Sequence, residues 1–460
     1  MEGSQKTATH LLHAEDVVIG ERSSRLSSTI VVLLCFLPVF STLLFGAVDT
    51  ITWVFIAVFW VAIILLWLAD AWKGRGLLMN TSVLQVPLVG LWLIGVVQVI
   101  PLGGTLSLDP FATRIFLVHL TVYIVFFAAC LTFINNEARL KTLVFLVMGF
   151  GAVMAFFGIL QRLANPDAIY GLRQTAQAIP FGPFINQHHF AAFMEMTSGV
   201  ALGLMFGKRT GQDKRILLAI AVVIMGIAVV FTSSRGGLLG FFGALAFVGL
   251  LNFLSGRWSG DNHKHHPKGN VQQKFIIAAS GVALLLVIFG SVLFLGGNAE
   301  LFRGLGVIEI QDGVSNGRAH FWPIALSIFL EHPFIGAGLD AFGVAFTRHD
   351  TWSGFLRVEQ AHNDYLQVLA DAGIAGFICV AAFIYLLFRK GLTTIGGARG
   401  FRHDAAIGAL AGCFGILIHS FFDFPLRTPS NGFFFLLLCA IATVPIKSEH
   451  VRSKHRSTSP

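Results

Sequence analysis

The chain has 460 residues, of which 55% are hydrophobic, whereas Asp, Glu, Lys and Arg together make up only 12%. That charged share is about half of what a soluble globular protein carries. The composition therefore argues against a soluble enzyme, a DNA-binding domain and a secreted disulfide scaffold, and predicts a polytopic membrane protein. We expect the net charge of +8 to reflect basic cytoplasmic loops and not nucleic-acid binding.

Twelve segments are apolar and long enough to cross a membrane, which takes about 20 residues of helix. They cover residues 30–47, 52–69, 83–100, 114–134, 141–161, 188–206, 216–232, 236–254, 275–297, 364–388, 404–422 and 431–446. The sequence thus predicts an all-α protein in five parts. These are a polar N-terminus (1–28), spans one to nine (29–297), a large periplasmic loop (298–363), spans ten to twelve (364–446) and a basic tail (447–460).

The positions of the basic residues predict the orientation of the chain. With both termini in the cytoplasm, every lysine falls on the inner side, as expected when Lys and Arg gather in cytoplasmic loops. The basic residues on the outer side are all arginines, whose planar fork grips phosphate in two-point fashion. They are Arg114, Arg162, Arg173, Arg235, Arg303, Arg318, Arg348, Arg357 and Arg427.

Five polar clusters fall at the same predicted membrane boundary, on the outer side, where two long loops (162–187 and 298–363) also lie. They are Asn186–Phe190, Ser233–Gly237, Gly317–Trp322 with His332–Gly338, Ala361–Leu366 and His419–Arg427. Long loops on one face mark it as the working face. The residues of these clusters that we expect to support a site there are Asn186, His189, Asn363, Asp364, Asp423 and Arg427.

Two of the outer arginines stand in glycine-framed positions. Arg235 follows Ser233-Ser234 and precedes two glycines, while Arg318 follows Gly317 and opens an amphipathic stretch. Flanking glycines let a ligand approach the backbone closely, and two arginines at headgroup depth suit a lipid-linked diphosphate. The alternative is that each arginine snorkels to ordinary phospholipid.

His362 is the candidate general base, because a neutral imidazole can accept a hydroxyl proton near neutral pH. A helix-capping or structural role is the alternative, and other histidines on the same face compete with it. These are His188, His189, His320, His332, His349 and His419. No spacing typical of a metal site emerges, so neither a catalytic metal nor a cofactor is expected.

Two carboxylates fall inside predicted spans. Glu195 lies about two turns below the outer end of the sixth span, and Asp371 lies two turns into the tenth. Acids within the membrane are costly and often functional. Structural pairing with an arginine or a helix backbone is the alternative, and the sequence leaves both open.

The ordered set of motifs resembles the O-antigen ligase and polymerase superfamily, most strongly over about 186–430. Four motifs carry the resemblance: Ser-Ser-Arg-Gly-Gly, Gly-Arg-x-x-x-Trp, His-Pro-Phe-Ile-Gly-Ala-Gly-Leu-Asp and Ala-His-Asn-Asp-Tyr-Leu. The late His-Ser-x-x-Asp-Phe-Pro-Leu-Arg also fits. One departure is His188, which stands where family members often carry an asparagine.

The resemblance implies a metal-independent glycosyltransferase of the bacterial inner membrane with its active face in the periplasm. Such enzymes move a glycan from undecaprenyl diphosphate to lipid A-core or to a growing polysaccharide. Carried over by position, Arg235 and Arg318 would bind the diphosphate and His362 would activate the acceptor hydroxyl. Ligase and polymerase remain alternatives. A secondary transporter is the alternative of a different class, although a transporter should place its polar site near the midplane.

Reporter fusions test the predicted orientation. Fusions at Gly211 and His265 should report cytoplasm, and fusions at Gln174 and Gly354 should report periplasm, because lysines flank only the first pair of sites. An inverted result at either pair would move the clusters to the wrong side of the membrane and contradict the function that rests on them.

Overall fold

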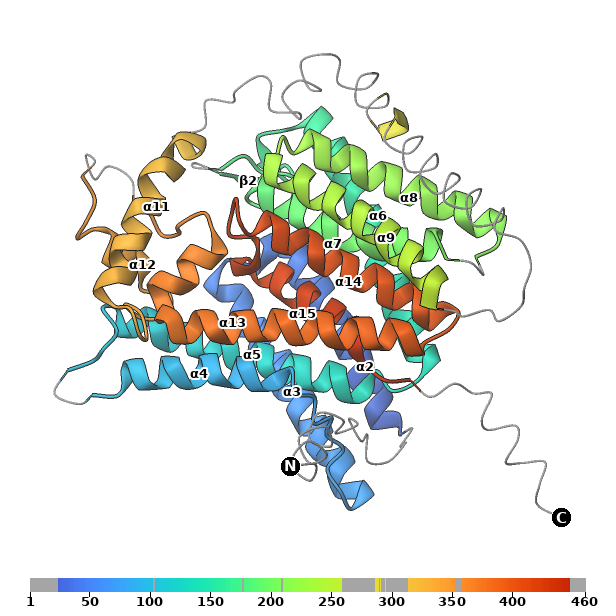
Figure 1. Ribbon diagram of the computed structural model, residues 1–460, viewed down its shortest axis with the longest axis horizontal. Coiled ribbons are helices and arrows are strands. Elements are labelled where there is room, and N and C mark those ends of the chain that lie inside the picture. Colours follow the sequence, from blue (N-terminus) through green and yellow to red (C-terminus); the bar gives the residue numbers. More distant parts are fainter. Residues whose placement is uncertain are drawn as a thin grey trace, which may run out of the picture.

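The computed structural model describes residues 24–101, 104–175, 178–207, 210–258, 286–288, 290, 294, 313–351 and 357–446. Within these residues the chain is all-α apart from one short hairpin (Figure 1). The helices are α2 (Arg25–Leu43), α3 (Thr50–Gly74), α4 (Gln85–Val99), α5 (Pro110–Phe133), α6 (Glu137–Ala164), α7 (Gln187–Met205), α8 (Gln212–Phe231), α9 (Arg235–Trp258), α11 (Gly313–Glu331), α12 (Phe342–Phe346), α13 (Asp364–Gly397), α14 (Phe401–His419) and α15 (Pro429–Thr443), with the 3-10 turns η1 (Phe45–Ala47) and η2 (Pro425–Arg427).

The predicted all-α membrane architecture is confirmed. Eight described helices are long and apolar enough to cross a membrane, and α4 and α15 are shorter apolar helices. Each predicted span except the ninth coincides with a helix. The ninth, 275–297, lies almost entirely outside the described residues, so the count of twelve spans stays a prediction.

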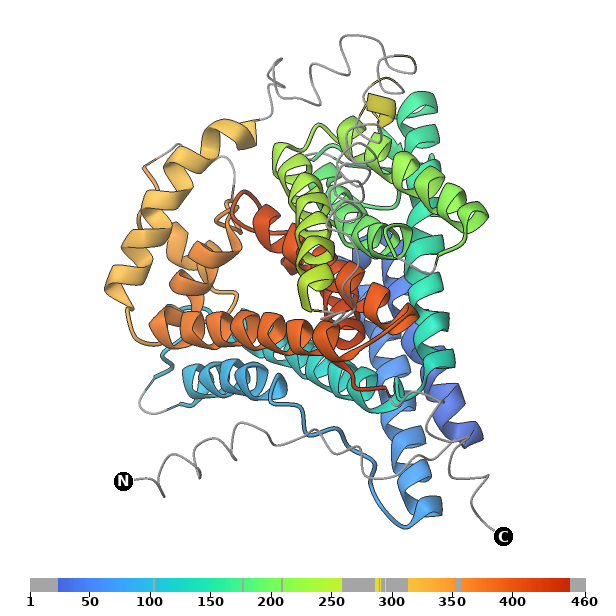
Figure 2. The ribbon, with the colours of Figure 1, turned by 45° about the vertical axis from the view of Figure 1, so that its right-hand side comes forward.

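The two long outer segments contain secondary structure. Residues 162–187 hold an antiparallel hairpin of β1 (Ala168–Ile169) and β2 (Arg173–Gln174). The predicted loop 298–363 holds α11, which coincides with the amphipathic stretch that Arg318 opens, and the short α12. Figure 2 shows α11 standing beside the end of α13, apart from the main bundle.

Helices α7 and α14 form the centre of the bundle, and among the described helices their mutual contact is the most extensive. Two Gly-x-x-x-Gly pairs, one on each helix, face each other in antiparallel register. A Cβ atom on Gly199 would lie 2.5 Å from the backbone nitrogen of Gly412, and one on Gly203 would overlap the backbone of Gly408. Small residues at such crossings let membrane helices approach closely.

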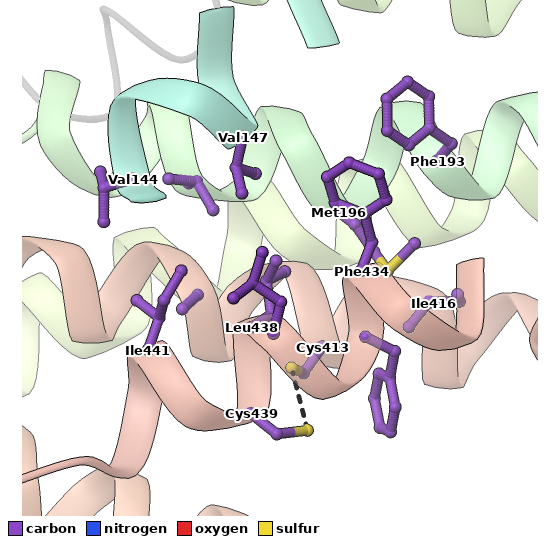
Figure 3. Close-up of a cluster of buried hydrophobic side chains, with 14 of the residues drawn as sticks. Val144, Val147, Phe193, Met196, Cys413, Ile416, Phe434, Leu438, Cys439 and Ile441 are labelled. Carbon is purple, nitrogen blue, oxygen red and sulfur yellow. Dashed lines mark hydrogen bonds between the residues drawn. The ribbon is translucent and has the colours of Figure 1, made fainter. Parts of the chain in front are cut away.

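An aliphatic and aromatic core fills the space between α6, α7, α14 and α15 (Figure 3). Val147 of α6, Phe193 of α7 and Leu438 of α15 are fully buried in it. Cys413 and Cys439 lie there with their Sγ atoms 3.9 Å apart and both thiols free, so they contribute as small buried packing residues.

Polar contacts gather at the two ends of the bundle. At the end predicted to be cytoplasmic, Arg215 donates to the carbonyl of Met205 (3.1 Å) and Arg402 to that of Ile441 (2.7 Å). These cations satisfy carbonyls in the last turns of α7 and α15, where the helix dipole is negative. At the opposite end, here called the outer end, lie the five polar clusters.

A second apolar cluster joins α11, α12 and the start of α13 at the outer end. Phe321 and Ile328 of α11 pack in it with Phe342 and Phe346 of α12 and with Ala370 of α13. This cluster fixes α11 against the outer end and positions Arg318, which α11 carries.

Substitution of Gly203 tests the close approach at the centre. Gly203→Ala should lower the unfolding free energy by about 1–3 kcal/mol or more, because the added methyl meets backbone that cannot shift. Gly249→Ala is the matched control, since a Cβ there meets nothing within 4 Å, and it should be neutral or slightly stabilising. Thermal unfolding of the purified proteins measures both. Equal melting temperatures for the two variants would contradict the packing argument.

Candidate active site

A break in α13 shapes the outer end. Gly373 interrupts the helix with φ 60° and ψ −162°, so residues 364–372 form a separate short helix. The segment that contains Gly336 runs against this break, and the amide of Gly338 donates to the carbonyl of Asp371 (3.1 Å). The amide of Ile374, freed by the break, donates to the carbonyl of Pro333 (2.8 Å). The motifs 332–338 and 370–376 are therefore two halves of one backbone contact.

Arg427 clamps the same junction. Its guanidinium donates to Asp340 (2.6 Å) and to Asp371, and its Cζ atom lies over the Phe116 ring, 5.2 Å from the ring centroid. Burial alone would lower the pKa of Arg427, but the charges of Asp371 and Asp340 raise it above its ordinary value. Arg427 thus stays charged and holds η2, α13 and the 333–341 segment together.

His362 pairs with Asp423. Nδ1 of His362 lies 3.0 Å from Oδ1 of Asp423, and the two side chains are 14% and 1% exposed. His362 has φ +51°, a left-handed conformation that is uncommon for residues other than glycine and that marks local strain. The pair occupies Nδ1 and leaves Nε2 as the other ring nitrogen of a partly exposed imidazole.

Asp423 is ionised in this setting. Burial would raise the pKa of its carboxyl, but the hydrogen bond from His362, with His188 and His189 nearby, holds that pKa well below its ordinary value. An anionic Asp423 favours a proton on Nδ1 of His362, which then donates the hydrogen bond. Nε2 is consequently the lone-pair nitrogen, as a general base requires.

Asn363 and Asp364 hold His362 in place. Asn363 is the N-cap of α13 and accepts from the amides of Tyr365 and Leu366, and its amide donates to the carbonyl of Phe421 (3.0 Å). The carboxylate of Asp364 accepts from the hydroxyl of Ser420 (2.8 Å). Both residues therefore fasten the start of α13 to the segment that carries Asp423.

Aromatic rings connect His362 to His189. The ring of Phe424 meets both imidazoles edge-on, with centroids 4.7 Å from His362 and 4.8 Å from His189. Nδ1 of His189 lies 2.6 Å from Oγ1 of Thr428, whereas its Nε2 is buried and has no partner among the described residues. Asn186, the N-cap of α7, fixes the turn before His189 by accepting from the amide of His188 (2.8 Å).

Arg318 reaches the same carboxylate from α11. Its Nη2 lies 4.0 Å from Oδ2 of Asp423, and the side chain is 26% exposed. Both Nε of Arg318 and Oδ2 of Asp423 are buried without a hydrogen-bond partner in the described part of the chain. The exposed quarter of the Arg318 side chain is the part that an incoming anion can contact.

Arg235 is exposed as the first residue of α9. Gly236, next to it, packs so closely that a Cβ there would lie 2.5 Å from the His419 ring and 3.2 Å from Cβ of Phe422. This contact sets Arg235 beside the segment that leads into Asp423. The two arginines approach that segment from different helices, α9 and α11.

The competing histidines differ from His362 in access or partner. His419 lies 2.8 Å from Glu195 but is only 1% exposed, so a substrate cannot reach it. His320 lies 2.8 Å from Asp350, between α11 and the segment after α12. Of the two carboxylates in predicted spans, Asp371 has the arginine partner that the structural alternative foresaw, and Glu195 has a histidine.

A metal site does not emerge from the described residues, since no three His, Cys, Asp or Glu side chains lie close enough to hold an ion. The acidic groups near His362 are instead bound to histidine, arginine or hydroxyl partners. The arrangement brings Arg318 and the imidazole of His362 to one carboxylate, that of Asp423.

Residues 220–381 match the family model described as O-antigen ligase, which supports the resemblance seen in the sequence motifs. The matched stretch contains both glycine-framed arginines and His362, while Asp423, the partner of His362, lies beyond its end. No curated protein matches the chain.

Removal of Arg427 tests the clamp. Arg427→Ala leaves Asp340 and Asp371 without their cation, and breaking such a buried pair should cost about 3–5 kcal/mol of unfolding free energy. The matched control is Arg357→Ala, since Arg357 is 62% exposed and pairs with Glu359 at the surface, where an ion pair contributes about 0–1 kcal/mol. Thermal unfolding in detergent compares them, and a smaller loss for Arg427→Ala than for Arg357→Ala would contradict the clamp.

Proposed function

We propose that the protein is a glycosyltransferase of the inner membrane that moves a glycan from undecaprenyl diphosphate to an acceptor on the periplasmic face. The acceptor is lipid A-core or a growing polysaccharide, which makes the protein an O-antigen ligase or a polymerase of the same superfamily. The observation that carries the proposal is the His362–Asp423 pair, with Arg318 4.0 Å from the same carboxylate.

His362 is the base that activates the acceptor. The acceptor hydroxyl gives its proton to Nε2 as its oxygen attacks the anomeric carbon of the donor sugar. Asp423 orients the imidazole through Nδ1 and stabilises the imidazolium that forms. The His362 side chain is 14% exposed, so part of the ring is open to a reactant while most of it is fixed by packing. Because Nδ1 is bound to Asp423, Nε2 is the nitrogen proposed to act.

Arg235 and Arg318 bind the diphosphate of the donor. The bond from the sugar to the diphosphate breaks as the acceptor bond forms, and negative charge grows on the departing phosphate. Cationic donors aimed at that charge lower the barrier because they bind the transition state more strongly than the ground state. The exposure of Arg235 and the 26% exposed side chain of Arg318 support this role.

His362→Asn separates chemistry from binding. Asparagine tolerates the left-handed backbone at this position but cannot act as a base, so turnover should fall roughly 10²–10⁴-fold with donor affinity nearly unchanged. His362→Ala should behave alike. The measurement is transfer in vitro from a polyprenyl-diphosphate glycan, with donor binding determined separately on folded protein. Full turnover in His362→Asn would mean that another residue is the base or that none is needed.

The arginines should affect the charged donor. Arg235→Ala and Arg318→Ala should each cost about 2–4 kcal/mol of transition-state stabilisation, and Arg235→Lys should lose less because it keeps the charge but not the fork. Arg348→Ala, at an exposed arginine without glycine framing, is the control and should resemble wild type. If Arg348→Ala matched Arg235→Ala, the arginines would act as a diffuse basic surface and not as a diphosphate site.

A further inference from the structure

A chain of three buried polar side chains runs beneath Arg235. Nδ1 of His419 lies 2.8 Å from Oε1 of Glu195, and Nε2 of His419 lies 3.4 Å from Oγ of Ser234. Oγ of Ser234 in turn accepts from the amide of Gly237 (3.1 Å) and so caps the first turn of α9. The chain thus links α7, α14 and α9 and ends one residue from Arg235.

Burial decides what this set can do. A serine, a histidine and an acid in this order resemble a nucleophilic triad, but Ser234 and His419 are each 1% exposed and Glu195 is fully buried. A reactant cannot contact Oγ of Ser234, so the set is not a second catalytic centre. The exposed residue next to the set is Arg235, at the start of α9.

The packing around the chain leaves little freedom. A Cβ atom on Gly236 would lie 2.5 Å from the His419 ring, and one on Gly237 would lie 2.6 Å from Cβ of Ala191. A Cβ on Gly240 would overlap the carboxylate of Glu195. The first turn of α9 therefore rests directly on the histidine and the acid, and a shift in either moves the turn.

We propose that Glu195 is a positioning residue that acts through His419 and Ser234 to hold Arg235 for the donor diphosphate. This inference rests on the proposed function, in which Arg235 binds that diphosphate. The Glu195 carboxylate keeps the proton of His419 on Nδ1, so that Nε2 accepts a hydrogen bond from the hydroxyl of Ser234. The cap on α9 is thereby fixed, and Arg235 meets the donor without first paying the entropy of ordering its turn.

A double-mutant cycle on the full-length protein tests the link. Glu195→Gln keeps the side-chain volume but removes the charge, and it should raise the donor KM roughly 5–30-fold while the acceptor KM stays near wild type. In the Arg235→Ala background the same change should alter the donor KM less than about twofold, because the group that Glu195 positions is gone. The probe is a polyprenyl-diphosphate glycan, with thermal unfolding recorded for each variant.

Two further variants complete the test, one as a control and one as a replacement for Glu195→Gln. Asp70→Asn removes another buried carboxylate, one that accepts from Ser24 at the opposite end of the bundle, and it should leave the donor KM unchanged. Should Glu195→Gln not fold, Ser234→Ala removes the cap without leaving a buried charge and should raise the donor KM in the same way.

The outcomes separate the two proposals. Equal effects of Glu195→Gln with and without Arg235, or an unchanged donor KM in Glu195→Gln, would overturn the positioning role and leave the proposed function intact. A donor KM and a turnover number that both stay unchanged in Arg235→Ala itself would instead overturn the part of the proposed function on which this inference rests.

Discussion

The close packing of α7, α14 and α9 fixes the positions of the polar side chains at the outer end. Glycines at both crossings bring backbone against backbone, and a methyl group in their place would push the helices apart. Because α14 carries His419 and leads directly into the segment of Asp423, its depth and rotation set where that segment emerges. The same contact aligns Glu195 of α7 with His419. Packing among the smallest residues therefore determines the geometry of the charged ones.

The ion pairs at the outer end join elements that are distant in sequence. Asp423 faces His362 and Arg318, Arg427 bridges two carboxylates, and Glu195 binds His419. An unpaired charge in such a setting would be strongly destabilising, so each pair also fastens one segment of the chain to another. These ion pairs therefore stabilise the fold and also position the residues of the candidate site.

Composition and apolar runs predicted eleven segments that the described helices match, because a span is defined by its own 20 residues, but they did not predict α11 and α12 within the loop 298–363. The motifs also predicted which clusters lie at one level, since each adjoins the end of a span. Neither the apolar runs nor the motifs could predict the break at Gly373. The break depends on the segment around Gly336, which packs directly against it. The partnership of His362 with Asp423 was equally hidden, although both residues were candidates, because 61 residues separate them and spacing carries no signal of contact. The role of Glu195 stayed open for the same reason.

The side chain of Gln98, at the end of α4, has a consequence for how the protein is assembled during synthesis. Its amide donates to the carbonyls of Ile335 and Asp371, and its oxygen accepts from the amide of Leu339 (2.9 Å). These partners are made more than 230 residues later. Until those residues have been synthesised and inserted, the side-chain amide of Gln98 in α4 lacks these hydrogen-bond partners. Helix α4 has only 15 residues, so its final seating is expected to be among the last events of biogenesis, after α13 has entered the bilayer.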